Sequence, residues 1–121
     1  MKQDAIKFLR GEAETLELFA SSKDAFYRYV ENNSLDESED YAEGGYDLSN
    51  YNENTWAHIW DQVSRRRGYD EQFANRIMDL IDAYYSGGSS YVENDVEAES
   101  RLLAEALNYV ADKLEGELNN E

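Results

Sequence analysis

The sequence contains no cysteine, no proline and a single histidine, His58, among its 121 residues. The absence of cysteine excludes disulfide bonds and thiolate metal sites. A lone histidine supplies neither the usual zinc ligands nor the Glu-x-x-His pairs of a di-iron bundle. His58 also has no matched general acid or base near it in the sequence, so we expect it to be a partly buried helical residue.

Long apolar runs are missing as well. No segment approaches the roughly 18 apolar residues of a transmembrane helix. The first residues, MKQDAIKFLRGEAE, carry charges throughout and lack the apolar centre of a secretory signal. Together with the absence of cysteine, these features predict a soluble, cytoplasmic protein that does not bind membranes.

Basic residues are scarce, with 11 Lys and Arg against 27 Asp and Glu and a formal net charge of −16. Residues 1–30 carry five charges of each sign, whereas residues 31–64 carry nine acidic residues and no basic one. Three arginines follow at 65–67, and residues 69–121 carry thirteen acidic residues against three basic ones. Such a chain repels DNA, RNA and anionic membranes, so its expected partners are basic surfaces or cations.

The composition is that of one helical domain spanning residues 1–121. Hydrophobic residues make up 41% and aromatic residues 13% of the chain, which excludes a disordered acidic tail. No alternating pattern is long enough to predict a strand. We therefore predict an all-α fold of about five helices, with an acidic loop or a short helix between the second and third helices.

The first half of the chain gives two predicted helices and one long connection. The first helix is placed at about Asp4–Ala20, with Asp4 as its N-cap, because apolar residues recur there at helical spacing. A short second helix is expected to begin at Ser22. Residues 33–54 show no clear periodicity, and a connection of this length is functional or hides a short helix, which we place near Leu35–Ala42.

The second half has clearer helix signals. The third helix, TWAHIWDQVSRRR, is expected to begin at a cap formed by Asn54 or Thr55 and to end at Gly68, where a C′ glycine belongs. Asp70 is the predicted cap of the fourth helix, EQFANRIMDLIDAYY, and the fifth runs from Asn94 or Asp95 to about Leu118. The predicted core consists of apolar residues that share one face of these helices: Phe8, Leu16, Phe26, Trp60, Ile77, Ile81, Leu103, Leu107 and Val110. Further along the last helix, Leu114 and Leu118 extend the apolar seam and would allow a homodimer.

Eight of the ten tyrosines fall into two groups by position. Three fall on or beside apolar stripes and are predicted core residues: Tyr29, Tyr84 and Tyr109. Five lie in acidic or loop segments: Tyr41, Tyr46, Tyr51, Tyr69 and Tyr91. An exposed tyrosine beside carboxylates offers rigid contact area and a hydroxyl group, so the second group either forms a partner surface or holds loops against the helices.

The most acidic stretch, DESEDYAEGGYD at Asp36–Asp47, holds six carboxylates and no cation. As an EF-hand loop it fails in both registers. A loop beginning at Asp36 puts Tyr41 at the sixth position, where the motif needs glycine. A loop beginning at Asp40 puts Ala42 at a ligand position. We therefore expect loose attraction of Ca²⁺ or Mg²⁺ but no metal site.

Catalytic signatures are missing too. No serine or lysine lies in a nucleophile motif, and the Gly-Gly pairs at 44–45 and 87–88 lack phosphate-binding patterns. The run SRRRG at 64–68 is either a small anion-binding patch or, as we favour, a set of cations that pair with the helix dipole and nearby carboxylates. The sequence therefore predicts no enzyme, no cofactor and no catalytic residue.

Acidic residues recur three or four positions apart on the predicted helices. The rows are Asp36, Glu39, Asp40 and Glu43, then Asp79 and Asp82, then Asp95 and Glu99, and finally Asp112 and Glu115. Helical neighbours of this kind lie roughly 5–6 Å apart, near the spacing of successive phosphates, so such rows can imitate a nucleic-acid backbone. The other interpretation is a solvated acidic face, although the net charge exceeds what solubility asks of a small domain.

In these features the chain resembles the DNA-mimic inhibitors encoded by phages and mobile elements, of the Ocr anti-restriction or acidic anti-CRISPR type. The stretches that carry the resemblance are LDESEDYAEGGYD, SSYVENDVEAES and DKLEGELNNE. It extends over the whole chain as composition and architecture, and no functional residue is carried over from it. The neutral first thirty residues and the arginine triplet depart from the type.

This resemblance implies a non-catalytic inhibitor in the host cytoplasm that occupies the nucleic-acid groove of a defence nuclease, without binding nucleic acid itself. The alternative is an acidic helical interaction module, such as an immunity protein for a basic toxin or an adaptor. The predicted partner-binding residues are acids and tyrosines of the two acidic runs: Asp36, Glu37, Glu39, Asp40, Tyr41, Glu43, Tyr46, Asp47, Glu53, Glu93, Asp95, Glu97 and Glu99.

Overall fold

The structure is a computed structural model that describes residues 1–21, 58–91 and 96–120. Within these residues every regular element is helical and no strand occurs, which confirms the all-α prediction for this part of the chain. The elements are α1 (Lys2–Ser21), η2 (Gln62–Arg66), α5 (Glu71–Ser86), η3 (Ser89–Tyr91) and α6 (Val96–Asn119). The predicted second helix, the helix near Leu35–Ala42 and most of the acidic stretch lie outside the described residues.

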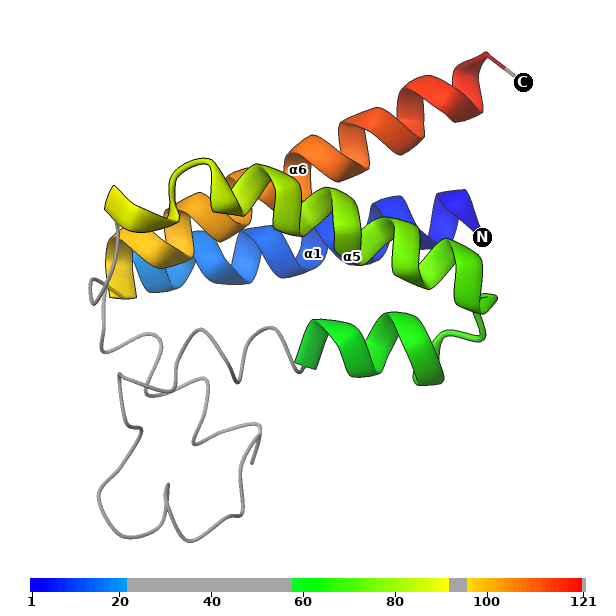
Figure 1. Cartoon of the computed structure of the whole chain (residues 1–121), viewed down its shortest axis with the longest axis horizontal. Helices are drawn as coiled ribbons and strands as arrows, with labels where there is room; N and C mark the ends of the chain where they lie inside the picture. Colours follow the sequence, from blue (N-terminus) through cyan, green and yellow to red (C-terminus); the bar gives the residue numbers. More distant parts are fainter. Residues whose placement is uncertain (22–57, 92–95, 121) are drawn as a thin grey trace, which may run out of the picture.

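Three long helices pack side by side. In Figure 1, α1 and α5 run in one direction, and α6 returns against both of them. The contacts of α6 with α1 and with α5 hold the arrangement together. The segment that contains η2 lies beside α5 and is connected to it by a short loop.

Small side chains allow α1 and α6 to approach closely. Ala5 and Ala13 are buried on α1, and Ala104 and Ala111 are buried on α6. Leucines fill the space between these alanines, and Leu107 is fully buried. Because apolar residues recur at intervals of three and four, each helix presents one continuous apolar stripe to the others.

The ends of α5 follow its sequence signals. The side chain of Asp70 accepts a hydrogen bond from the backbone N–H of Phe73 at 2.8 Å, which confirms the predicted N-cap. The helix ends at Ser86, before the glycine pair. A short 3₁₀ segment, η3, follows directly after this pair. α6 is helical as far as Asn119, one residue beyond the predicted end.

The segment before α5 is helical from His58 and changes to π-helical geometry in η2. Gly68 follows with φ of +74°, the left-handed conformation that favours glycine at C′. The prediction of a helix that stops at Gly68 is therefore confirmed. Its predicted beginning at Asn54 or Thr55 lies outside the described residues.

The predicted core is confirmed apart from Trp60, which is 42% exposed, and Phe26, which lies outside the described residues. Ile59 and Val63 occupy the buried side of that segment instead. Two predicted core tyrosines, Tyr84 and Tyr109, are also on the surface, at 36% and 42% exposure.

Two further predictions are corrected at single residues, and one open alternative is decided. Asp4 is not an N-cap, because α1 begins at Lys2 and Asp4 lies in its first turn. Tyr69 is 7% exposed and takes the second of its two predicted roles, holding the loop before α5 against α1, whereas Tyr91 is 88% exposed. Leu114 is fully buried within the chain and is therefore not available to a dimer surface. None of the helices in the described part of the chain is long and apolar enough to cross a membrane.

Candidate functional site

Most of the predicted partner-binding residues lie outside the described residues. The two that the structure places are Glu97 and Glu99, in the first turn of α6, where carboxylates are favoured by the helix dipole. Both are half-buried. Burial, and secondly the charge of Glu99, raises the pKa of Tyr85 to about 12, so Glu99 lies close to a core tyrosine of α5.

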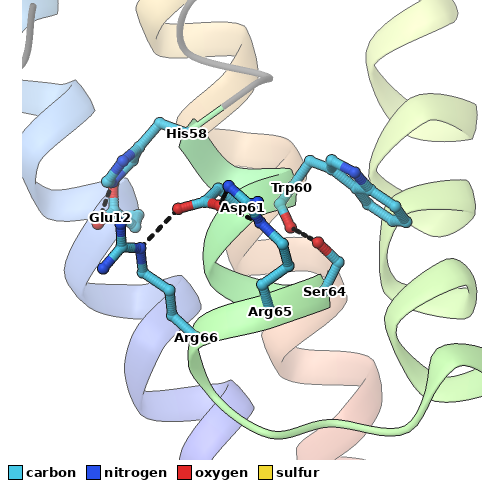
Figure 2. A network of polar contacts seen from close by, with 7 residues as sticks. All are labelled: Glu12, His58, Trp60, Asp61, Ser64, Arg65 and Arg66. Atoms are coloured by element: carbon cyan, nitrogen blue, oxygen red, sulfur yellow. Dashed lines mark hydrogen bonds and ion pairs between the residues drawn. The ribbon is translucent and has the colours of Figure 1, made fainter.

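The arginine triplet is bound to carboxylates of its own chain, as predicted. Arg65 Nε donates to Asp61 Oδ1 at 2.6 Å, and Arg66 Nε donates to Asp61 Oδ2 at 2.7 Å (Figure 2). These hydrogen bonds, first that from Arg66, hold the pKa of Asp61 below its usual value. Both arginines thus neutralise one carboxylate within the same short segment.

Arg67 joins the end of this segment to the beginning of α1. Its Nη1 donates to Asp4 Oδ2 at 2.9 Å, and the hydroxyl of Tyr69 donates to the same oxygen at 2.5 Å. The guanidinium also lies over the Phe8 ring, 4.2 Å from its centroid. The pKa of Asp4 is lowered, first by the bond from Tyr69 and then by that from Arg67. This cluster explains why Asp4 is not an N-cap, and it shows Tyr69 holding its loop against α1, one of the two roles predicted for it.

Two more arginines connect α6 to its neighbours. Arg10 on α1 donates to Asp112 Oδ1 at 2.8 Å and to Glu115 Oε2 at 2.6 Å. Arg76 on α5 donates to both carboxylate oxygens of Glu117, at 2.6 and 2.8 Å. The predicted acidic row at Asp112 and Glu115 is therefore a pair of ligands for Arg10, and a partner would have to compete with that arginine for it.

His58 contacts a residue that is distant from it in the sequence. Its Nε2 lies 3.4 Å from Glu12 Oε1 on α1, and Figure 2 shows it pointing toward α1 while Trp60 points the opposite way. The contact with Glu12 raises the pKa of His58; desolvation opposes this, Asp61 adds to it and Arg66 works against it. The two residues are 46 positions apart, so no local sequence signal could have identified the pair.

Some charged side chains of this protein are held in ion pairs, whereas several acidic side chains are not. Five of the arginines are engaged by carboxylates of the helical part. By contrast, Asp79 and Asp82, a predicted acidic row on α5, are exposed and have no cationic partner among the described residues. Outside the described residues, the segment 22–57 holds nine acidic residues and two basic ones. The arginines thus offset acids near themselves and leave most of the negative charge elsewhere.

An aromatic pair forms a second surface feature, which the sequence did not indicate. Tyr84 of α5 and Tyr109 of α6 lie with ring centroids 5.0 Å apart and planes inclined at 32°. Lys113 Nζ lies 5.8 Å from the Tyr109 centroid. Both rings are partly exposed, so the pair offers aromatic surface on the outside of the helices.

Among the described residues, no three acidic or histidine side chains gather closely enough to hold a metal ion. No protein family, curated protein or solved structure matches this chain.

Proposed function

We propose that this chain is a non-catalytic inhibitor that occupies the nucleic-acid-binding groove of a basic protein in place of DNA. The observation that supports the proposal is the separation of charge along the chain. Five of the six arginines in the described residues are held in ion pairs, while residues 31–57 contain eight acids and no basic residue. A groove lined with Lys and Arg would meet concentrated negative charge in a stretch that has no basic residue of its own.

The helical part would serve as the support for this charge. Its ion pairs connect α1 to α6, α5 to α6, and the residues after η2 to α1. The acidic segment 22–57 is joined at both ends to the described helices along the chain, and closing a chain into a loop lowers its conformational entropy. Binding then requires less ordering than it would for a free acidic peptide.

The first test is inhibition of a restriction endonuclease and of a Cas9–guide complex, the two target classes that the resemblance suggests. Binding to a susceptible enzyme is expected to compete with duplex DNA. It should weaken at least about tenfold between about 50 mM and about 200 mM salt, because a groove built for phosphates binds through many charges. Tight binding that duplex DNA does not displace would contradict the mimic.

A second candidate function is supported by the exposed aromatic side chains. Trp60, Tyr84, Tyr91 and Tyr109 all lie on the surface of the described residues. Exposed aromatics are typical binding hot spots, so an acidic interaction module, such as an immunity protein for a basic toxin, is the alternative. It predicts that alanine substitution at one or two of these aromatics abolishes binding, whereas the mimic predicts losses spread over many acids.

A further inference from the structure

The pair formed by Tyr84 and Tyr109 is the most distinctive surface feature of the helical part. The two rings come from neighbouring helices and are arranged in a tilted stack, 5.0 Å between centroids. Neither hydroxyl has a hydrogen-bond partner among the described residues. Helical spacing alone allowed both side chains to be buried, yet the core is filled by Tyr85 and Val110 next to them.

One ring of the pair already has a cation near its face. Lys113 lies one turn after Tyr109 on α6, with its ammonium 5.8 Å from the ring centroid. The face of an aromatic ring is negative and attracts cations. One turn before Tyr109, the exposed carboxylate of Glu105 adds negative charge on the same side of the helix. The aromatic surface thus lies in a setting that favours positive charge.

We propose that Tyr84 and Tyr109, together with Glu105, form a docking point for an arginine side chain of a basic protein partner. Arginine fits better than lysine, because its planar, weakly hydrated guanidinium stacks on aromatic rings and also donates hydrogen bonds in its plane. The net charge of −16 disfavours nucleic acids, anionic lipids and a second copy of the chain as occupants. The inference rests on the proposed function in that both require a basic partner.

The test uses two fluorescein-labelled peptides, nona-arginine and nona-lysine, titrated against the full chain by fluorescence anisotropy at fixed ionic strength. The parent protein is expected to bind nona-arginine about threefold to tenfold more tightly than nona-lysine. The double variant Tyr84→Leu/Tyr109→Leu should bind both peptides with nearly equal affinity, since general charge attraction remains. The matched variant Tyr84→Phe/Tyr109→Phe keeps the ring faces and should keep the preference.

A preference for arginine that survives in the leucine variant would overturn the proposal, and so would equal affinities in the parent. Thermal unfolding of each variant, followed by circular dichroism, separates loss of the site from loss of the fold. Failure of the proposed function has a different outcome: the peptides would still show the tyrosine-dependent preference, but the chain would not compete with duplex DNA for a nuclease.

A charge-matched pair of lysine variants provides an independent control. Lys113→Gln removes the cation beside the Tyr109 ring, whereas Lys7→Gln removes the same charge from an exposed position on α1. If the ring face is the docking point, Lys113→Gln should strengthen nona-arginine binding more than Lys7→Gln does. Equal effects would mean that only net charge matters and would count against the site.

Discussion

At the scale of single residues, His58 connects the segment before η2 to α1 through Glu12, and its protonation decides the strength of this contact. The contact raises the pKa of His58 in the folded protein above its unfolded value of roughly 6.5. The contribution of this contact to stability is therefore fully present below about pH 6.5 and is lost as the pH rises through the pKa of His58 in the folded protein.

We predict that His58→Gln lowers the free energy of unfolding by about 0.5 kcal/mol at pH 6 and by less at pH 8.5. Urea unfolding of the parent and the variant at both pH values measures this difference. Glu12→Gln should remove the same pH-dependent contribution to the free energy of unfolding. The matched control is Glu14→Gln, an exposed position on α1, which should leave the pH dependence unchanged. If the loss of unfolding free energy in His58→Gln were larger at pH 8.5 than at pH 6, it would contradict the contact between His58 and Glu12.

Individual burial was the least predictable property of this sequence. On α5, both Tyr84 and Tyr85 fit a helical stripe that contains Ile77 and Ile81, because intervals of three and four are both allowed. The position of α6 decides in favour of Tyr85. The choice between the two roles predicted for Tyr69 was open for a comparable reason, since its partner Asp4 is 65 positions away. Neither choice is contained in local spacing.

At the scale of elements, the turn between η2 and α5 depends on Gly68. Its φ of +74° is unfavourable for other residues, although a Cβ added there would have no atom within 4 Å. The effect of a substitution is therefore conformational and does not arise from a clash.

We predict that Gly68→Ala lowers the free energy of unfolding by about 1 kcal/mol. Gly116→Ala is the matched control, because Gly116 lies within α6, also without an atom within 4 Å of an added Cβ. There alanine should raise the free energy of unfolding by about 0.5–1 kcal/mol. Denaturant unfolding of both variants measures the contrast, and a loss of equal size at the two glycines would show that φ at Gly68 is not the cause.

Helix ends were predictable where a side chain or glycine fixes them locally, as Asp70 and Gly68 do. The beginning of α1 was not, because Asp4 resembles a cap but its carboxylate is bound by Arg67 and Tyr69 instead. The ion pairs between helices were also beyond prediction. The triplet at 65–67 indicated cations that would find carboxylates, but only the packing of the helices decides which ones.

At the scale of the whole molecule, charge is the property that the proposed function depends on. Residues 22–57 and 92–95 together contain eleven of the 27 acidic residues and lie outside the described helices. Concentrated like charges repel one another, so they reduce stability unless a basic partner is present. The sequence predicted this distribution directly, since counting charges requires no knowledge of the fold.

The role of the acidic stretch in binding a basic groove is measured by the association rate of a variant in which its six carboxylates are neutralised. Its six substitutions are Asp36→Asn, Glu37→Gln, Glu39→Gln, Asp40→Asn, Glu43→Gln and Asp47→Asn. The control variant reaches the same net charge by Glu14→Lys, Asp79→Lys and Asp82→Lys at exposed positions of α1 and α5. Melting temperatures measured alongside should show both variants folded.

Stopped-flow measurements at low salt give the association rate of each variant with the nuclease that the parent inhibits. The account predicts that the six-fold variant associates at least about tenfold more slowly than the control, because local charge steers the encounter with a basic groove. Its melting temperature should equal or exceed that of the parent, since repulsion has been relieved. A six-fold variant that associates as fast as the parent, or a control that loses as much, would contradict the account.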